Sequence, residues 1–284
     1  MNGQSSLQRV ANAPVEYSAK PSEASLRITY IGHATLLLQF GGACVLTDPN
    51  YDEKLGLFLP RVSAPGMKMS ELPHIDAILL THAHADHLSF RTLRALPSGI
   101  PIYAPPPIAR WLQREGITSA QAVQLGQMIR VGTVVVTAAA ARHMGARYGM
   151  DRWRGAAQMY LVDDGSVSVL FTGDTALTPN AVALARSILP RRVDVALLPI
   201  GFAPWWKEFF FRRGHLTAGD ALLLFEQVNA RIFIPFHWGT FRHVTSSAYD
   251  GIRVLRSLLQ SYAGASRVKI LSPGEMIPVN SSVT

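Results

Sequence analysis

Cysteine is almost absent from this chain, and Cys44 is the only one among its 284 residues. A single thiol excludes an intrachain disulfide framework. Cys44 lies in residues 40–46, an apolar stretch that predicts a buried strand and a core side chain rather than a metal ligand. No apolar run is long enough for a secretory signal or a membrane-spanning helix. We therefore expect a cytoplasmic protein, with peripheral contact at a membrane left open.

Charged residues are also few, and acidic ones are the scarcer kind. The chain has 19 Asp and Glu against 27 Lys and Arg, which gives a net charge of +8, and 48% of its residues are hydrophobic. That apolar content is enough for one sizeable domain, expected over residues 25–284 after a flexible arm over residues 1–24. The positive balance favours anionic partners, although an Arg-rich composition can equally reflect the base composition of a genome.

Three histidines and one aspartate lie within six consecutive residues, at His82, His84, Asp86 and His87. Such a cluster is unfavourable unless a cation binds it, because imidazolium charges repel and a lone buried carboxylate loses its hydration. Residues 75–81 predict a short buried strand, and an extended chain just beyond it directs His82 and His84 to the same side. The pattern predicts that these two bind one metal ion while Asp86 and His87 face a second. A solvated His-rich loop is the alternative.

Three further apolar stretches each predict a strand followed by a residue that can bind a metal. They are residues 131–137 with His143, residues 167–172 with Asp174, and residues 231–236 with His237. Sites in open α/β folds lie at the carboxyl ends of strands, where loops converge. Any one of these histidines alone would more often be an ordinary half-buried side chain. Four strand ends that each deliver such a residue are hard to obtain by chance, so together they predict a metal site.

Helical spacing of apolar residues occurs in five segments. The segments are residues 89–96, 107–115, 180–189, 217–229 and 247–262. Thr217 and Asp220 fit a capping pattern at the start of the fourth. We expect these helices to be ordinary amphipathic segments whose apolar faces pack on the core.

The motif H-x-H-x-D-H after a strand, here residues 82–87, resembles the signature of the metallo-β-lactamase superfamily. The resemblance implies an α/β fold, namely a four-layer αββα sandwich. It also implies two divalent metal ions per chain, for which zinc is the first expectation and iron or manganese the alternatives. The implied ligands are His82, His84 and His143 for the first metal, Asp86, His87 and His237 for the second, and Asp174 as the bridge. No cysteine lies near them, unlike the zinc sites of many true β-lactamases.

The chemistry implied by the resemblance is hydrolysis by a hydroxide that bridges the two metals. Two such ions about 3.5–4 Å apart lower the pKa of a shared water from ~15.7 to near 7, so no Ser or Cys nucleophile is needed. Asp86, Asp174 and His215 are the implied catalytic residues. His215 is expected to lie beside the metals and to orient the substrate or protonate the leaving oxygen. A position flanking the start of a helix is the ordinary alternative for it.

Further motifs narrow the resemblance. Residues 30–35 (Tyr-Ile-Gly-His-Ala-Thr) and 236–241 (Phe-His-Trp-Gly-Thr-Phe) resemble the N-acylphosphatidylethanolamine phospholipase D-like group, which also has lactonase relatives. His33 and Asp48 are then expected to orient metal ligands, with a plain structural role as the alternative. The sequence departs from that group at Ala85, where an aromatic residue is frequent. Substrate identity is therefore where the resemblance transfers least.

An unusual aromatic stretch precedes His215. Residues 202–213 contain two Trp, four Phe and three basic residues. This composition suits a lid or acyl-chain pocket, a contact between subunits of a homo-oligomer, or, less strongly, a membrane surface or nucleic acid. Trp205, Trp206 and Phe209 are its candidate substrate-binding residues.

Arginine also clusters around His143, at Arg142, Arg147, Arg152 and Arg154. A guanidinium can pair bidentately with a phosphate or carboxylate group, and Arg147 is the candidate for that role.

Taken together, these features predict a dinuclear metal-dependent hydrolase of an anionic small molecule or lipid. The resemblance to the phospholipase D-like group implies a phosphodiester as the favoured substrate, with an N-acylated phospholipid as one candidate. A lactonase or other carboxylic-ester hydrolase of a small anionic metabolite is the alternative. An RNA-processing nuclease is a weaker one, because no RNA-binding module is evident. A long apolar groove under residues 202–211 would favour the lipid, whereas a small Arg-lined pocket would favour the lactone.

Overall fold

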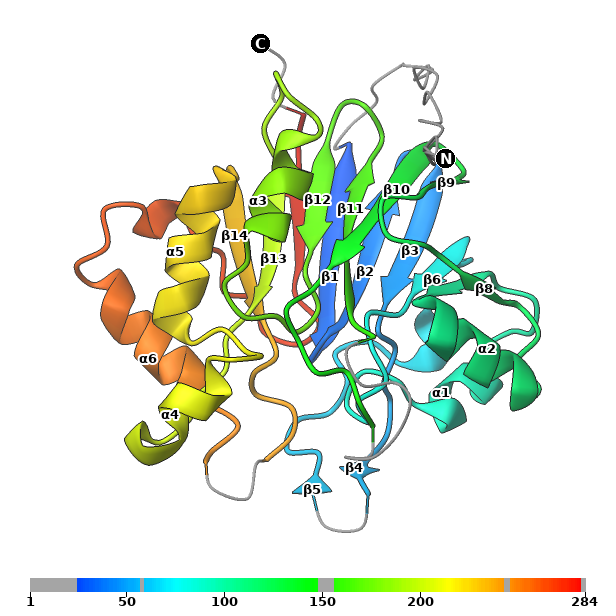
Figure 1. Ribbon diagram of the computed structural model, residues 1–284, viewed down its shortest axis with the longest axis horizontal. Coiled ribbons are helices and arrows are strands. Elements are labelled where there is room, and N and C mark those ends of the chain that lie inside the picture. Colours follow the sequence, from blue (N-terminus) through cyan, green and yellow to red (C-terminus); the bar gives the residue numbers. More distant parts are fainter. Residues whose placement is uncertain (1–24, 57–58, 148–155, 243–245, 282–284) are drawn as a thin grey trace, which may run out of the picture.

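The structure is a computed structural model that describes residues 25–56, 59–147, 156–242 and 246–281. Two β-sheets lie face to face at its centre, and helices cover the outer face of each (Figure 1). The helices on one side are α1 (Phe90–Ala95) and α2 (Pro106–Arg114); those on the other are α3 (Pro179–Arg186), α5 (Ala218–Val228) and α6 (Asp250–Leu259). The four-layer αββα sandwich predicted from the sequence is therefore confirmed. The arm expected over residues 1–24 lies outside the described residues.

The two sheets have seven and six strands. The first has the order β15-β1-β2-β3-β6-β7-β8, and the second has the order β14-β13-β12-β11-β10-β9. The strands of the first are β1 (Leu26–Gly32), β2 (Thr35–Phe40), β3 (Ala43–Thr47), β6 (Ala77–Leu79), β7 (Ile102–Ala104), β8 (Ala120–Ala122) and β15 (Met276–Val279). Those of the second are β9 (Met128–Val131), β10 (Val134–Ala140), β11 (Gln158–Asp163), β12 (Ser168–Phe171), β13 (Val195–Pro199) and β14 (Ile232–Phe236). The short strands β4 (Lys54–Leu55) and β5 (Leu59–Pro60) pair separately, and two single 3₁₀ turns span Met69–Glu71 and Ala265–Arg267.

The period of two along a strand divides apolar side chains between two cores. In β2, Leu36 and Leu38 point into the core between the sheets, whereas Leu37 points to the core under α1 and α2. All three side chains are fully buried. Both faces of this sheet therefore need apolar residues, which is why its strands are almost continuously hydrophobic rather than alternating.

Strand direction brings the candidate site residues to one edge of the sandwich. β6 runs parallel to β3 and β7, and β12, β13 and β14 run parallel to one another. β10 points the same way as β12, because each is antiparallel to β11. The loops after β6, β10, β12 and β14 carry the predicted metal ligands. The carboxyl ends of these four strands therefore bring the predicted ligands to a common edge of the sandwich, as expected for a site in a layered α/β fold.

Most of the helices and strands predicted from the sequence are present in the structure, but two predicted strands are interrupted by turns. The five predicted helices are present, with ends that differ by a few residues, and α5 begins with the predicted capping box of Thr217 and Asp220. The single strand predicted over residues 131–137 is wrong. Gly132 adopts a positive φ of 54° and turns the chain between β9 and β10. The strand predicted over residues 40–46 is likewise interrupted, because a turn at residues 41–42 separates β2 from β3.

One helix was not predicted. Residues of the aromatic stretch form α4 (Trp205–Phe211), which lies at the lower left of the molecule in Figure 1, beside α6. Among the helices of the described residues, none is both long enough and apolar enough to cross a membrane.

Candidate metal centre

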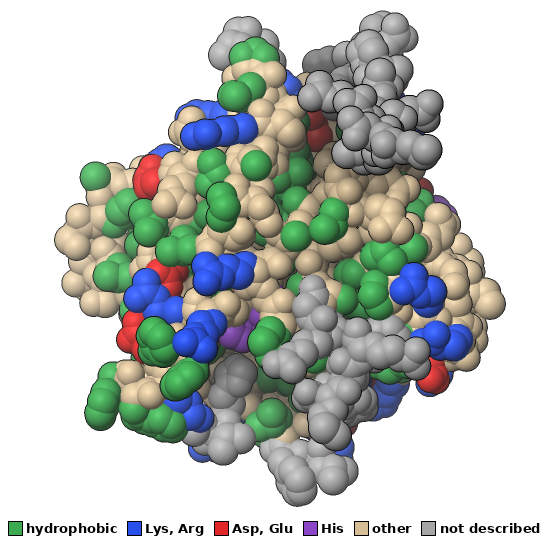
Figure 2. Space-filling model, viewed as in Figure 1, with side chains coloured by type: hydrophobic (Ala, Val, Ile, Leu, Met, Phe, Trp, Pro, Cys, Tyr) green, Lys and Arg blue, Asp and Glu red, His purple; other side chains and the backbone are tan. Residues whose placement is uncertain are grey.

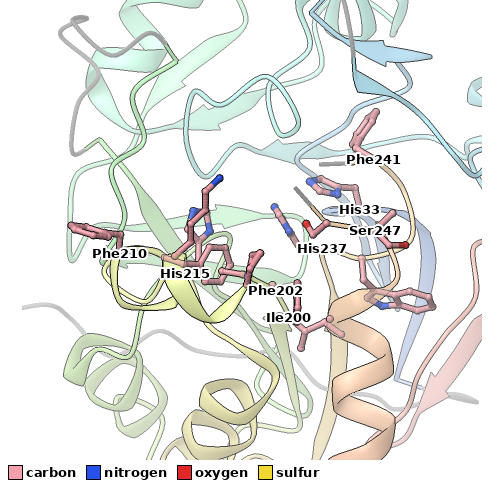
Figure 3. Close-up of a pocket in the computed structure, with 17 residues that line it drawn as sticks. His33, Ile200, Phe202, Phe210, His215, His237, Phe241 and Ser247 are labelled. Atoms are coloured by element: carbon pink, nitrogen blue, oxygen red, sulfur yellow. The ribbon is translucent and has the colours of Figure 1, made fainter. Parts of the chain in front are cut away.

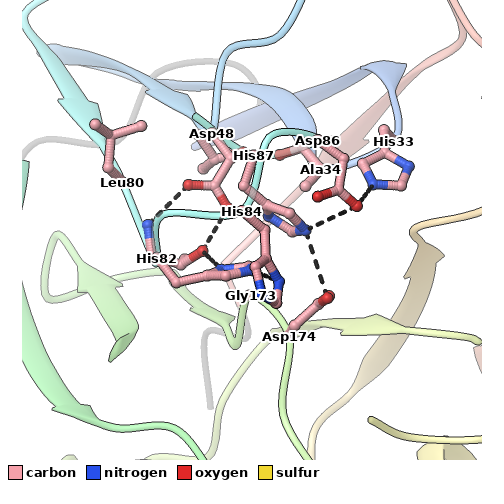
Figure 4. A network of polar contacts seen from close by, with 12 residues as sticks. His33, Ala34, Asp48, Leu80, His82, His84, Asp86, His87, Gly173 and Asp174 are labelled. Atoms are coloured by element: carbon pink, nitrogen blue, oxygen red, sulfur yellow. Dashed lines mark hydrogen bonds and ion pairs between the residues drawn. The ribbon is translucent and has the colours of Figure 1, made fainter. Parts of the chain in front are cut away.

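Eight side chains capable of metal binding gather at the carboxyl edge of the sheets. Figure 4 labels six of them, namely His33, His82, His84, Asp86, His87 and Asp174. Within each of two groups, one potential ligand atom per residue lies within 4.8 Å of the others. The first group is His82, His84, His143 and Asp174, and the second group is His33, Asp86, His87 and His237. The structure thus brings together all seven ligands predicted from the sequence, and it adds His33 to the second group.

Three ring nitrogens converge in the first group. His84 Nδ1 lies 3.0 Å from His82 Nε2 and 3.1 Å from His143 Nε2. His143 donates its Nδ1 hydrogen to the carbonyl of Gly214 at 2.8 Å, so its Nε2 carries a lone pair. Thr81 donates its hydroxyl hydrogen to Asp48, so it accepts one from His82 Nδ1, and His82 Nε2 is also a lone-pair atom.

The lone pairs of His82 Nε2 and His143 Nε2 both face His84 Nδ1, which can donate a hydrogen to only one of them. The remaining lone pair is repelled unless a cation lies among the three nitrogens. The donor set therefore fits a metal ion. Three imidazoles are a typical ligand set for zinc and are also used by iron.

Unpartnered polar atoms mark the second group. His87 Nε2, His237 Nε2 and Asp174 Oδ1 are buried and lack a hydrogen-bond partner among the described residues. His237 Nε2 lies 3.4 Å from Asp86 Oδ2 and 3.3 Å from Asp174 Oδ2, and His87 Nε2 lies 3.6 Å from the same Asp174 oxygen. Buried polar atoms are rarely left without partners, so this arrangement also fits a bound cation. Asp174 belongs to the first group, and its Oδ2 also lies within 3.6 Å of His87 and His237 of the second, so its carboxylate lies between the groups.

The electrostatics of the two groups differ. Burial lowers the pKa of all three first-group histidines, that of His143 to about 3, so their rings are neutral at pH 7. Burial acts in the same direction on His87 and His237, but the carboxylates of Asp174 and Asp86 outweigh it. They raise the pKa of His237 to about 9 and that of His87 well above its usual value. A metal ion that binds the second group therefore displaces protons.

Asp48 orients the His87 ring through the nitrogen that does not face the other candidate ligands. Its carboxylate is fully buried and accepts hydrogen bonds from His87 Nδ1 at 2.7 Å and from the backbone and hydroxyl of Thr81 at 2.8 and 2.6 Å. Because the Nδ1 hydrogen is held by Asp48, His87 Nε2 is the atom left for a metal. One carboxylate thus links Thr81, two residues after β6, to a ligand of the second group, as expected for a residue that orients a metal ligand.

His33 holds Asp86. Its Nε2 lies 2.9 Å from Asp86 Oδ2, and burial lowers its pKa to about 3, so the neutral ring donates a hydrogen to the carboxylate. His33, Asp48 and His237 have positive φ angles of 56°, 31° and 67°. The fourth such non-glycine residue in the described chain, Asn229, ends α5. Strained backbone therefore concentrates at the candidate metal centre, where positioning matters more than local stability.

A cavity of about 620 Å³ opens beside the second group (Figure 3). His215 and Phe210 lie on one wall, and His33, Phe241 and Ser247 on the other, with His237 between them. Most of the lining is apolar, and Lys207 is the only charged residue among the described residues that form it, histidines aside. Its volume is within the range of small-molecule sites. The full lining is His33, Ile200, Gly201, Phe202, Ala203, Pro204, Lys207, Phe210, Phe211, His215, His237, Trp238, Phe241, Ser246, Ser247, Ala248 and Gly251.

His215 links the cavity to the metal centre. Its Nδ1 lies 3.4 Å from Asp174 Oδ2, and its side chain is 30% exposed. The ring stacks on Phe211, with 4.6 Å between centroids, and meets the edge of His143 at 4.7 Å. The ring is therefore held in place and still open to a substrate.

The other predicted substrate residues lie elsewhere. Arg147 donates to the carbonyls of Ala83 and Leu88 at 3.3 and 2.8 Å, and its guanidinium lies over Phe90 and Trp111. These contacts brace the loop that carries the ligands and do not support the expected pairing with a substrate anion. Two of the other arginines of that cluster, at positions 152 and 154, lie outside the described residues.

Trp205, Trp206 and Phe209 do not line the cavity, and 86%, 54% and 68% of their surface is exposed. The predicted substrate contact is therefore not supported for these three. Lys207, Phe210 and Phe211 of the same helix line it instead. Helical spacing of three and four residues was the signal that could have separated the two faces of this stretch.

Comparison with known proteins gives consistent matches. A family model described as "Beta-lactamase superfamily domain" matches residues 44–238. A curated relative from Methanoculleus marisnigri, named "UPF0173 metal-dependent hydrolase", is 30% identical over 258 residues, which cover 89% of this chain and 97% of the relative. An "N-acyl-phosphatidylethanolamine-hydrolyzing phospholipase D 1" from Caenorhabditis elegans is 27% identical over 250 residues, 80% of this chain and 68% of the relative. This chain spans 59% of the length of the uncharacterized mycobacterial relatives that it also matches.

Among solved structures, an isothiocyanate hydrolase from Delia radicum gut bacteria superposes with a TM-score of 0.73. The two are 19% identical, and the match covers 90% of this chain and 100% of the other. At this identity, the likeness shows a shared fold and no more.

Proposed function

The chain belongs to the metallo-β-lactamase superfamily of metal-dependent hydrolases, and we propose that it cleaves a phosphodiester in an amphiphilic substrate. One observation carries the proposal, namely the apolar cavity of about 620 Å³ directly beside the second ligand group. A small pocket for an anionic lactone would be expected to contain arginine, but no arginine is among the described residues that line this cavity. An apolar cavity under residues 202–211 instead suits a substrate with a hydrocarbon part.

The seven predicted ligands would hold two divalent ions, with His82, His84 and His143 at one and Asp86, His87 and His237 at the other. Asp174 lies between them. When bound, the ions would supply Lewis acidity and lower the pKa of a water molecule at the site. Histidine and carboxylate ligands suit zinc, and iron and manganese are compatible with the same set.

His215 would act on the leaving group. It lines the cavity, is partly exposed, and is held by Phe211 and Asp174. As a water oxygen bonds to phosphorus and the bond to the leaving oxygen breaks, a proton from this ring would pass to the departing oxygen, which leaves as a neutral alcohol. The proton lost by the water would restore the ring. This step matters most for a poor leaving group such as an alkoxide.

Lys207 would recognise an anionic group at the mouth of the cavity. It is exposed, lines the cavity, and has no ion-pair partner among the described residues. The apolar part of the substrate would then lie against Phe202, Phe211 and Trp238. The name of the Caenorhabditis elegans relative supports an N-acylated phospholipid as one such substrate. A nucleic-acid backbone would need more than one cation along its path.

The test is a hydrolysis panel on the purified protein, combined with measurement of its metal content. The panel holds bis(p-nitrophenyl) phosphate, N-acylphosphatidylethanolamines of short and long acyl chain, and lactones of matched chain length. We expect about two metals per chain and phosphodiester turnover, with kcat/KM that rises with acyl-chain length. Leu125→Ala, which changes an exposed side chain that does not line the cavity, is the control and should turn over the panel as the wild type does. Turnover of lactones without any phosphodiester cleavage would overturn the proposal.

A further inference from the structure

Helix α4 exposes an unusual amount of aromatic surface. Trp205, Trp206, Phe209 and Phe210 are exposed over 86%, 54%, 68% and 67% of their surface. In Figure 2, hydrophobic side chains together with Lys and Arg side chains gather at the lower left, where Figure 1 places α4. Large aromatic side chains in contact with water are unfavourable, so a cluster of them beside a cavity indicates a surface that binds something.

The seven-residue helix has two faces with separate tasks. Lys207, Phe210 and Phe211 line the cavity, whereas Trp205 and Phe209, four residues apart, point away from it. The outward face therefore has no part in the cavity described above, and its exposure needs another explanation.

Two cations lie on these aromatic rings. Lys207 Nζ is 4.6 Å from the centre of the Trp206 ring, and the Arg213 guanidinium is 4.7 and 5.2 Å from the rings of Phe209 and Phe210. Neither cation has an ion-pair partner among the described residues. Arg212, by contrast, is paired with Asp220. The exposed surface thus combines aromatic rings with uncompensated positive charge.

Charge decides between the possible occupants. A second copy related by a twofold axis would bring Lys207 and Arg213 of both copies together, which is unfavourable. An anionic lipid surface satisfies both components, because Trp and Phe enter the interfacial layer while Lys and Arg contact the headgroups. The net charge of +8 favours the same partner over longer range.

We propose that α4 docks the protein on an anionic lipid surface, with Trp205 and Phe209 entering the interface and Lys207 and Arg213 contacting headgroups. Because Lys207 and Phe210 also line the cavity, docking through α4 would place the cavity next to the lipid surface. This last consequence rests on the proposed function, since it lets an amphiphilic substrate pass from the lipid layer to the metal centre without crossing water.

The test is sedimentation with vesicles of phosphatidylcholine alone or mixed equally with phosphatidylglycerol. The wild type should bind the mixed vesicles and bind the neutral ones weakly. Trp205→Ala combined with Phe209→Ala should weaken binding to mixed vesicles by about tenfold or more, because two interfacial side chains are lost. Arg213→Glu should weaken it less and reduce the preference for anionic lipid, because Lys207 and a positive net charge remain. Leu125→Ala, which removes an exposed apolar side chain elsewhere, should bind as the wild type does.

Each alternative has its own outcome. A wild type that binds neither vesicle, or a double variant that binds as well as the wild type, would overturn the proposal. So would a lipid-free dimer that the double variant converts to a monomer in analytical ultracentrifugation, because a second copy would then cover α4. Neither Trp205 nor Phe209 lines the cavity, so the double variant should keep its turnover of soluble bis(p-nitrophenyl) phosphate. Vesicle binding without any hydrolysis on the panel would contradict the proposed function alone.

Discussion

The candidate metal centre and helix α4 border the same cavity, but the two regions treat their side chains in opposite ways. His82 and His87 are fully buried, and each is held by a hydrogen bond to its Nδ1 atom. Trp205 and Phe209 instead expose most of their surface to solvent. The first region is built to hold atoms in place, and the second to present a surface. Substitutions in the metal centre should therefore reduce turnover of every substrate. Substitutions on the outward face of α4 should reduce binding to lipid and leave turnover of soluble substrates unchanged.

The largest effect is expected from Asp86→Ala. The substitution removes a predicted ligand and the acceptor of His33, so kcat/KM should fall by about 10³-fold or more on every substrate. Metal content measured by plasma mass spectrometry should fall to about one ion per chain, with the circular dichroism spectrum unchanged. The double variant of α4 is the comparison, since it should keep both metals. Equal losses of soluble-substrate turnover in the two variants would erase the contrast between the regions.

His215→Gln should have a large effect that depends on the leaving group. A phosphodiester with an alkoxide leaving group needs the proton from His215, so its kcat should fall by about 10²-fold. Bis(p-nitrophenyl) phosphate releases a stable phenolate and should lose far less. The measurement is kcat for both substrates across pH, with metal content as the control. The same loss on both substrates would mean that His215 only positions its neighbours.

Asp48→Asn should weaken metal binding without touching a metal directly. The carboxylate fixes the Nδ1 hydrogen of His87, and its loss should reduce metal affinity by about 10–100-fold in a chelator competition. Asp76→Asn is the matched control, because Asp76 also accepts a backbone hydrogen bond, from Cys44, but contacts no predicted ligand. If the two variants bind metal equally well, Asp48 has only a structural role.

The smallest effect is a difference in proton release between the two groups. With its pKa near 3, His143 is already neutral at pH 7.5, whereas His237, with its pKa raised to about 9, is protonated. Binding of an ion to the first group should release almost no proton, and binding to the second should release about one or more. Affinity for the second ion should therefore increase with pH up to about 9. Titration calorimetry in two buffers of different ionisation enthalpy measures this, and equal release at both steps would contradict it.

Prediction from sequence succeeded where local pattern and global position coincide. Residues 82–87 follow a buried strand, and strand ends in a layered fold meet at one edge, so spacing alone was enough to propose a shared site. The capping box at Thr217 was predictable for a similar reason, because both partners are three residues apart. The prediction of one strand over residues 131–137 was wrong, because an apolar run does not reveal that the chain reverses direction at Gly132.

Roles that depend on direction could not be predicted. Arg147 was placed near His143 by sequence, but in the fold its guanidinium turns to the carbonyls of Ala83 and Leu88. The aromatic stretch was expected to supply Trp205 and Phe209 to the substrate, but as a helix it turns those side chains outward. A side chain's surroundings depend on the element packed against it, which composition does not show.

The sequence by itself determined that several strand ends carry His and Asp residues suited to a metal site, because this follows from hydrophobic periodicity and from the donor atoms of these residues. The sandwich fold and the order of the ligands were predicted from the family resemblance of residues 82–87. Only the tertiary structure decided that His33 joins the second group and that the cavity is apolar. It also decided which face of α4 lines the cavity. These depend on segments far apart in the chain, such as Phe202 and Ser247, and no local pattern specifies how such segments meet. Burial and distance, the two quantities that set pKa and metal fit, arise only when the chain has folded.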